Sequence, residues 1–386
     1  MQTTKKALFL IAIILISGFS GVIANRYIFP RLAMMKFFAK YDFIKKSTEA
    51  VTIINKTEQV YIKEDASVNK IVSQVIASVV NVTSYAVSEK IGTKTLSGVT
   101  IQPTTKNGTG LVVTSDGLVV TYASVLIADN AKYKVTFDNG NVYDATLLEV
   151  DSYSNLAFLK IEASNLSVAS FANSDEAKPG EKIIAVGNDS LTGVPFFSAG
   201  VLSSFNPYYN LSEKIIASSE KLEGIFEVDL EAQTHYIGGP IVDYAGQIIG
   251  ITGMVNRDSK ENFFQIPSNK VKLVIDKEIK KELETNCALG IYYVPIAKTY
   301  ASINNLPSEF GALIYSPSGQ QGLAVIANSP AANAGLRIND IISAVAEDKI
   351  DAGKSLPDLL YKHKKGEEVE LTVLRNSEEL KIKVQL

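Results

Sequence analysis

The chain has 386 residues, 46% of them hydrophobic, and a formal net charge of −3. This length predicts two or three domains rather than one core, and the absence of a basic stripe argues against nucleic acid as a partner. The single cysteine, Cys287, excludes an intrachain disulfide, and the only two histidines, His235 and His363, are too far apart along the chain to indicate a metal pair. We therefore expect no metal and no cofactor.

The first predicted element is an uncharged apolar run over residues 7–24, which follows two lysines. The run reaches the lower length limit for a helix that crosses a bilayer. A signal peptide that is cleaved after Val22-Ile23-Ala24 is the alternative. We favour a retained anchor because of the length, and predict a single-pass membrane protein. Residues 1–6 would be cytoplasmic, residues 25–65 a stalk, and the bulk of the chain extracytoplasmic.

The region that follows the stalk changes from a helical to a strand pattern. Residues 66–80 carry apolar side chains at helical spacing. Short apolar runs then recur to about residue 277, and the turn pairs Asp116-Gly117 and Asn139-Gly140 predict hairpins. Many short strands at this spacing predict an all-β sandwich or a pair of barrels. The apolar cluster between Ser268 and Glu284 predicts a closing helix.

The last hundred or so residues, from Leu289 to Leu386, predict a separate domain of ordinary size. Pro330 suits the first position of a short helix and Gly335 suits its C-terminal cap. A second helix is predicted near Leu356 to His363, and a hairpin closes the chain. Strands and helices together predict an α+β unit.

One loop in the strand-rich region carries a family signature. Asp229 to Ile241 contains Gly238-Gly239-Pro240 and leads into a β-hairpin. This stretch resembles the nucleophile loop of the HtrA family of trypsin-like serine proteases. Other segments resemble that family in the same order along the chain: Gly108–Gly110, Thr121–Val125, Asp151–Ala157, Gly187–Asn188, Ser198–Val201, Phe263–Pro267 and Ser329–Asp340.

The resemblance implies a mainly β fold. It places a trypsin-like double β-barrel at residues 66–285 and a PDZ domain, of α+β class, at residues 286–386. The transmembrane helix predicted above would precede both. HtrA proteins commonly form trimers, so the resemblance also implies a homotrimer or a mixed oligomer with active homologues.

The departures from the family fall on its chemistry. The resemblance puts Ser124 at the position of the catalytic histidine, Asn155 at that of the aspartate and Ile237 at that of the serine. His235 and Tyr236 replace the glycine and asparagine of the loop that forms the oxyanion hole. Ile237 has no oxygen and no transferable proton, so it cannot attack a carbonyl. With nucleophile, base and orienter all replaced, we predict that the chain has no catalytic residues and is a pseudoprotease.

The C-terminal domain keeps more of its family's binding features. Leu289-Gly290-Ile291 resembles the loop in which PDZ domains bind the terminal carboxylate of a peptide through backbone N–H groups. Such a peptide adds as a strand beside an open sheet edge, and the helix near Leu356 would form the opposite wall of the groove. We expect this edge to be uncovered. Charged or bulky residues that close it near Ile291 would argue against peptide binding and favour a domain used for internal packing.

The predicted function is that of a membrane-anchored, extracytoplasmic pseudoprotease from a bacterium. It would bind the C-termini of peptides or unfolded proteins as a scaffold, sensor or regulator of protein quality control. Two alternatives stay open. One is a residually active serine endopeptidase with rewired catalysis, for example through a Ser-Lys pair. The other is a silent structural subunit of an HtrA-like oligomer.

Overall fold

The computed structural model describes two separate units of the chain, Met1–Ile62 and Lys63–Leu386. The described residues are 64–86, 105–128, 130–189, 194–212, 216–230, 234–257, 260–283 and 287–386, together with Ser17, Ser20, Ile23, Ala24 and Ile28. The predicted anchor at residues 7–24 and the stalk at residues 25–65 lie almost wholly outside this set. Among the residues that are described, no helix is long and apolar enough to cross a membrane.

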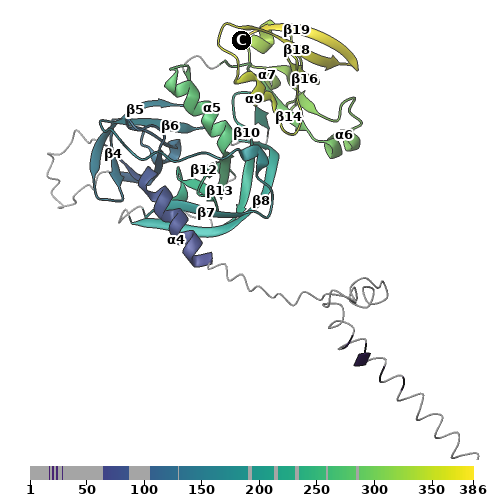
Figure 1. Cartoon of the computed structure of the whole chain (residues 1–386). Helices are drawn as coiled ribbons and strands as arrows, with labels where there is room; N and C mark the ends of the chain where they lie inside the picture. Colours follow the sequence, from purple (N-terminus) through teal and green to yellow (C-terminus); the bar gives the residue numbers. More distant parts are fainter. Residues whose placement is uncertain are drawn as a thin grey trace, which may run out of the picture. The chain divides into compact units, whose positions relative to one another are not determined.

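The first barrel of the unit Lys63–Leu386 is closed and antiparallel, with the strand order β1-β2-β3-β6-β5-β4 (Figure 1). Its strands are β1 (Val79–Ala86), β2 (Thr105–Val112), β3 (Leu118–Tyr122), β4 (Ala131–Phe137), β5 (Val142–Val150) and β6 (Leu156–Ile161). The turns at Asp116-Gly117 and Asn139-Gly140 connect β2 to β3 and β4 to β5, which confirms both predicted hairpins. The interior is filled by fully buried aliphatic side chains such as Val80, Val120 and Leu159.

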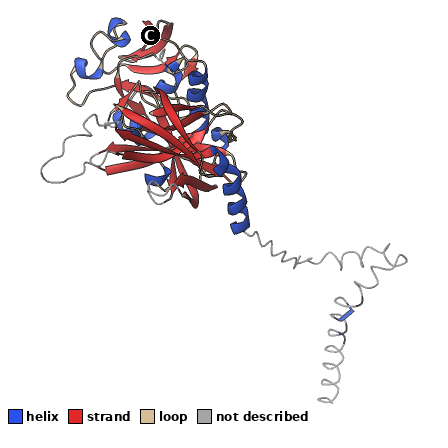
Figure 2. Ribbon diagram, turned by 90° about the vertical axis from the view of Figure 1, so that its left-hand side faces the viewer, coloured by secondary structure: helices blue, strands red, loops and turns tan. Residues whose placement is uncertain are grey.

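A second closed barrel follows in the strand order β10-β13-β12-β11-β7-β8. Its strands are β7 (Lys182–Asn188), β8 (Pro195–Asn210), β10 (Glu223–Asp229), β11 (Pro240–Asp243), β12 (Ile248–Arg257) and β13 (Lys260–Pro267). Seen from a direction 90° away, strands dominate this part of the molecule (Figure 2). The predicted pair of barrels is therefore the observed architecture.

Short helical elements flank the barrels. They are α4 (Glu64–Val75), η2 (Ile76–Ser78), η3 (Ala123–Val125), η4 (Ser174–Glu176), η5 (Thr234–Tyr236) and α5 (Ser268–Ile279). The prediction that the closing helix reaches Glu284 was wrong, because α5 ends at Ile279 and the backbone of Lys281 is left-handed, with φ 56°. A left-handed residue cannot continue a right-handed helix.

The C-terminal part forms a sheet in the order β19-β18-β16-β15-β14-β9, with β17 paired to β16. Its strands are β9 (Ala217–Ser218), β14 (Tyr292–Ile296), β15 (Gly311–Ile314), β16 (Ile341–Val345), β17 (Asp348–Lys349), β18 (Glu368–Arg375) and β19 (Glu378–Gln385), and its helices are α6 (Lys298–Asn304), α7 (Gln321–Ala324), α8 (Pro330–Asn333) and α9 (Leu356–Leu360). The second predicted helix thus ends at Leu360 rather than His363. Figure 1 shows β14 and α9 beside β10 of the second barrel.

Candidate functional site

The positions that the resemblance assigns to the histidine and the aspartate lie next to each other in the first barrel. Ser124 sits in the 3-10 turn η3, directly after β3. The N–H of Ala123 donates to the carbonyl oxygen of Asn155 at 2.9 Å, so the loop before β6 is tied to this turn. Asn155 adopts the left-handed region, with φ 59°, which asparagine tolerates better than most residues.

The position assigned to the serine is brought to the same place from the second barrel. The N–H of Thr109, in β2, donates to the carbonyl oxygen of Ile237 at 2.9 Å. Gly238 follows with φ 79°, and a Cβ on it would clash with the carbonyl of Thr109 and the hydroxyl of Thr121. Only glycine allows this approach. The fold therefore gathers the three positions between the barrels, as in a working protease, although the side chains differ.

The side chains at these positions are arranged for packing and not for proton transfer. Ile237 is 6% exposed and belongs to the main hydrophobic cluster with Tyr122 and Val125. The Ser124 hydroxyl is buried and has no hydrogen-bond partner among the described residues. The Asn155 amide donates to the Tyr122 hydroxyl at 3.3 Å and accepts from the Lys221 ammonium at 2.9 Å. At none of the three positions does the side chain supply the group that the family mechanism needs there, which is a base at 124, a carboxylate at 155 and a nucleophile at 237.

The backbone of the former nucleophile loop is also closed. In trypsin-like proteases the N–H of the nucleophile residue helps to bind the oxyanion. Here the N–H of Ile237 donates to the carbonyl oxygen of Thr234 at 3.2 Å, within the 3-10 turn η5. The carbonyl of His235 accepts from the Thr109 hydroxyl at 2.8 Å, which fixes the turn in this orientation. An oxyanion would have to break this turn before it reached the Ile237 amide.

The two altered loop residues fill space beside a phenylalanine. The rings of His235 and Tyr236 lie 5.2 and 5.7 Å from the ring of Phe196, and Tyr236 is buried. Nδ1 of His235 is 3.9 Å from Oδ2 of Asp189, which is too long for a hydrogen bond. Within the described ranges, no group of three or more His, Cys, Asp and Glu side chains is placed to hold a metal ion.

The second candidate site is the loop that resembles a PDZ carboxylate loop. Gly290 has φ 82°, and Leu289 and Ile291 beside it are buried. The Gly290 N–H donates to a carboxylate oxygen of Glu220 at 2.7 Å. The Ile291 N–H donates to the hydroxyl of Ser219 at 3.1 Å. The loop thus turns two successive amides toward oxygen acceptors, which suits the binding of an anion.

The sheet edge beside this loop is not open. Tyr292 and Tyr293 of β14 pair antiparallel with Ser218 and Ala217 of β9, a short strand from the loop between β8 and β10. The expectation of an uncovered edge was therefore wrong. Sequence reasoning missed β9 because a two-residue strand leaves no periodic signal.

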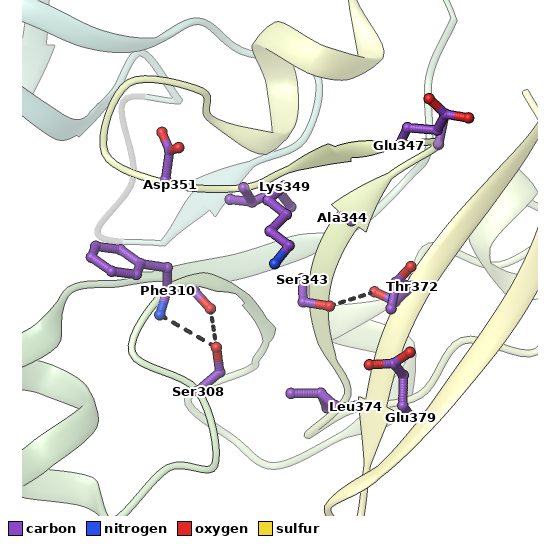
Figure 3. A pocket seen from close by; sticks show the side chains of 12 residues that line it. Ser308, Phe310, Ser343, Ala344, Glu347, Lys349, Asp351, Thr372, Leu374 and Glu379 are labelled. Atoms are coloured by element: carbon purple, nitrogen blue, oxygen red, sulfur yellow. Dashed lines mark hydrogen bonds between the residues drawn. The ribbon is translucent and has the colours of Figure 1, made fainter.

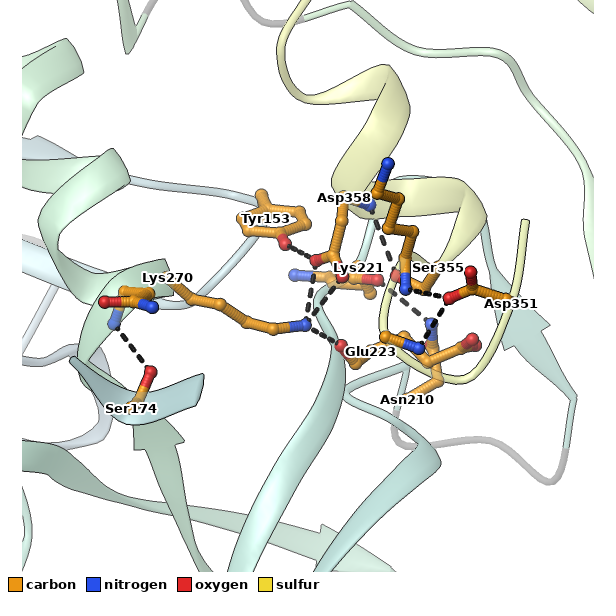
Figure 4. A network of polar contacts seen from close by, with 12 residues as sticks. Tyr153, Ser174, Asn210, Lys221, Glu223, Lys270, Asp351, Ser355 and Asp358 are labelled. Atoms are coloured by element: carbon orange, nitrogen blue, oxygen red, sulfur yellow. Dashed lines mark hydrogen bonds and ion pairs between the residues drawn. The ribbon is translucent and has the colours of Figure 1, made fainter. Parts of the chain in front are cut away.

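A partly buried polar network joins Asp358 of α9 to the barrels (Figure 4). The Lys270 ammonium contacts both carboxylate oxygens of Asp358, at 2.8 and 2.9 Å, and also the carbonyl of Glu223. The Tyr153 hydroxyl donates to the same Asp358. Burial raises the pKa of Glu223 to about 7, although its hydrogen bond from the Tyr293 hydroxyl, at 2.7 Å, lowers it. These contacts tie α9 and β14 to the barrels.

A separate hollow of about 620 Å³ lies elsewhere on the same sheet, among β16, β17 and β18 (Figure 3). Lys349, Phe310 and Glu379 are among its lining residues. None of the loop residues 289–291 lines it. It is therefore distinct from the predicted peptide site.

Comparisons with known families agree with this architecture. Residues 108–251 match the family described as trypsin-like peptidase domain, and residues 288–386 match the PDZ domain family. Solved structures with a similar fold include "HtrA-type protease AlgW with tripeptide", with a TM-score of 0.62 and 21% identity over 82% of this chain and 95% of that one. The same protease "with decapeptide" gives a TM-score of 0.61 at 20% identity, over 82% and 97%.

Related sequences come from several bacteria. A "Probable periplasmic serine endoprotease DegP-like" of Chlamydia muridarum is 31% identical over 285 residues, which are 72% of this chain and 53% of that protein. A protein of the same name from Brucella suis is 29% identical, over 72% and 52%. The "Serine protease Do-like HtrA" of Lactobacillus helveticus is 29% identical, over 72% and 66%. The chain spans about half the length of the first two relatives.

Proposed function

The chain belongs to the HtrA family of trypsin-like proteases with a PDZ domain, and on that premise we propose that it is a catalytically inert member that binds polypeptide C-termini. It would act as a scaffold, sensor or regulator of protein quality control. The observation that carries the loss of catalysis is Ile237, a buried aliphatic side chain at the position of the nucleophile.

The surroundings of Ile237 support the same conclusion. No group at position 124 or 155 can accept and return a proton as histidine does. The amide that an oxyanion would need is engaged with Thr234. An intact oxyanion hole alone leaves roughly 10³–10⁴-fold acceleration over water in a protease without its triad. Because the turn at Ile237 is closed, we expect even this residual acceleration to be small.

The binding half of the proposal rests on the Gly290 loop. Its two amides donate to oxygen atoms of the chain itself, a carboxylate of Glu220 and the hydroxyl of Ser219, and donors directed in this way suit a terminal carboxylate. The related protease AlgW was solved with a tripeptide and with a decapeptide. We propose that peptide or unfolded-protein C-termini bind at Leu289, Gly290 and Ile291.

The proposed location follows from the relatives and from the N-terminal sequence. Two of the relatives are named as periplasmic proteases. We propose that residues 7–24 anchor this chain as a single helix and that residues 66–285 and 286–386 function outside the cytoplasm. Membership of a homotrimer or mixed oligomer stays a prediction.

Catalytic inertness is tested with the full chain in detergent. Incubation with β-casein, an unfolded protein, should give no cleavage, and a fluorophosphonate probe should not label the protein. An active HtrA protease in the same buffer is the positive control. Cleavage that disappears when one serine is replaced by alanine would instead support a rewired endopeptidase.

Peptide binding is tested with a fluorescent peptide library in two forms, one with free C-termini and one with amidated C-termini. The proposal expects binding only by the free carboxylates, and loss of that binding in Gly290→Ala. The substitution places a Cβ at φ 82° and against Ser329. Equal binding of the amidated peptides would contradict the proposed site.

A further inference from the structure

We propose that Ala217–Glu220 is an internal ligand of the PDZ carboxylate loop, and that an external peptide binds only when this segment leaves. The proposal rests on the proposed peptide-binding function and names its regulation. The segment belongs to the loop between β8 and β10 of the second barrel, whereas the loop that it occupies opens the PDZ domain.

The main chain of the segment follows the path of a bound peptide. Ala217 pairs with Tyr293 and Ser218 pairs with Tyr292, in antiparallel register. The next residue, Ser219, donates its N–H to the carbonyl of Ile291 at 3.1 Å. The chain therefore runs along β14 toward the carboxylate loop, which is the direction that a C-terminal peptide takes when it adds as a strand.

The side-chain carboxylate of Glu220 resembles the terminal carboxylate of a bound peptide. The Gly290 N–H donates to Oε1 of Glu220 at 2.7 Å. The hydroxyls of Ser219 and Ser218 donate to Oε1 and Oε2 of the same carboxylate, at 2.6 and 2.7 Å. A side-chain carboxylate thus takes the place that the terminal carboxylate of a peptide would occupy. Both cannot accept from the Gly290 amide at once.

The segment is pre-shaped for this position. The Asn210 amide donates to the carbonyls of Ser218 and Lys221, at 3.1 and 3.0 Å, and its oxygen accepts from the Ser218 N–H at 3.2 Å. Just beyond the segment, the buried Glu223 accepts from the Tyr293 hydroxyl. Because the segment is tethered and ordered, its effective concentration at the loop is in the range of millimolar or higher. An external peptide must compete with that concentration.

The internal ligand also indicates the chemistry of its competitors. The positions along β14 are filled by Ala217, Ser218 and Ser219, whose side chains are small. The last of these donates its N–H to Ile291, as the final residue of a peptide would. We therefore use as probe the peptide of residues 213–219, Glu-Lys-Ile-Ile-Ala-Ser-Ser, with a free C-terminus.

The first experiment follows hydrogen exchange at the Gly290 and Ile291 amides of the full chain in detergent, without peptide. Glu220→Ala removes the carboxylate, and Glu181→Ala is a control at an exposed glutamate of the second barrel. A hydrogen bond to a charged group is worth roughly tenfold or more in an equilibrium. We expect Gly290 exchange to accelerate about tenfold or more in Glu220→Ala and to stay unchanged in the control. Equal exchange in wild type and Glu220→Ala would overturn the proposal.

The second experiment measures binding of the probe peptide by anisotropy to the same proteins and to Glu220→Gln. If the loop is occupied, apparent affinity falls with the fraction of open molecules. Glu220→Ala should bind the probe about tenfold or more tightly than wild type, Glu220→Gln should be intermediate, and the amidated probe should not bind. Equal affinities in wild type and Glu220→Ala would overturn the internal ligand and leave the proposed function standing. Faster exchange without any peptide binding would support the internal ligand and refute the proposed function.

Discussion

Two loops of the molecule each carry a backbone N–H group at a position that the family resemblance assigns to anion binding, and the two groups have different hydrogen-bond partners. In the loop that ends at Ile237, the Ile237 amide donates a hydrogen bond to the carbonyl of Thr234 inside a 3-10 turn. In the loop at Gly290, the amide points out of its own loop and donates a hydrogen bond to the carboxylate of Glu220. The Ile237 amide is thus bonded within its own loop, whereas the Gly290 amide is bonded to a side-chain carboxylate from another part of the chain.

The difference shows that the backbone path of a loop can be fixed by packing, whatever side chain stands at its end. Gly238 still allows the close approach between the barrels, because a Cβ there would clash with Thr109 and Thr121. The path of the loop is therefore fixed by packing and does not depend on a serine at position 237. At Gly290 the backbone is left-handed and the amide donates outside its own loop, to Glu220. Three predictions test this contrast, from the largest effect to the smallest.

The first prediction concerns restoration of the triad. The triple variant Ser124→His, Asn155→Asp, Ile237→Ser should react with a fluorophosphonate far more slowly than an active HtrA protease, because the closed turn withholds the oxyanion donor. Adding His235→Gly and Tyr236→Asn should raise the labelling rate by roughly 10²–10³-fold, the usual value of one oxyanion donor. The rate of labelling is followed by gel fluorescence.

The control for this prediction is folding. Circular dichroism at the assay temperature must show the strand content of wild type in both variants. Equal labelling rates in the variants with three and with five substitutions would mean that the turn at Ile237 opens freely. The proposed difference between the two loops would then be contradicted.

The second prediction concerns the packing role of Ile237. Truncation to alanine leaves a cavity in the main hydrophobic cluster and should lower the free energy of unfolding by about 2–5 kcal/mol, whereas Ile237→Val should cost about 0.5–1.5 kcal/mol. Denaturant unfolding of the full chain in detergent measures both. If Ile237→Ala lost less unfolding free energy than Ile237→Val, Ile237 would not be packed in the hydrophobic cluster as described.

The third prediction concerns pH and Glu223. Its pKa rises from an ordinary 4.5 to about 7 on folding, mainly through burial. The folded state then binds more protons than the unfolded state between these values, so the stability that the neutral form provides is present below pH 4.5 and is lost as pH rises to about 7. The loss amounts to about 3 kcal/mol.

Glu223→Gln should remove that part of the pH dependence and make the protein more stable than wild type at pH 8. The groups around Glu223 are Tyr293 of β14, Asn210 of β8, Lys270 of α5 and Asp358 of α9. The measurement is the difference in unfolding free energy between variant and wild type from pH 4 to 8. A constant difference across that range would contradict the prediction.

Much of the fold followed from local sequence. Apolar runs between turn pairs such as Asn139-Gly140 predicted the strands of the barrels, because a hairpin turn and an alternating pattern are short-range signals. The order of the family-like segments predicted the PDZ domain. The side chains at 124, 155 and 237 were readable directly, and with them the absence of a nucleophile at Ile237.

What the sequence did not reveal depends on partners far apart along the chain. The pairing of Ser218 with Tyr292 leaves no trace in either segment, since a two-residue strand has no period to detect. The contact of Glu220 with Gly290 and the hydrogen bond from Tyr293 to Glu223 likewise arise only when the barrel loop meets the C-terminal sheet. The closed turn at Thr234 depends on the hydroxyl of Thr109, from the other barrel.

The pairing of β9 with β14 has a consequence for how the protein behaves in a crowded compartment. A strand with unpaired N–H and C=O groups is a template on which other chains can polymerise. Because Ala217 and Ser218 cap the border of the sheet, Tyr292 and Tyr293 do not present that template to neighbouring molecules. If β9 left and no peptide replaced it, the backbone groups of β14 would be free to pair with other molecules. Pairing of β14 with β9 or with a peptide would therefore also limit aggregation.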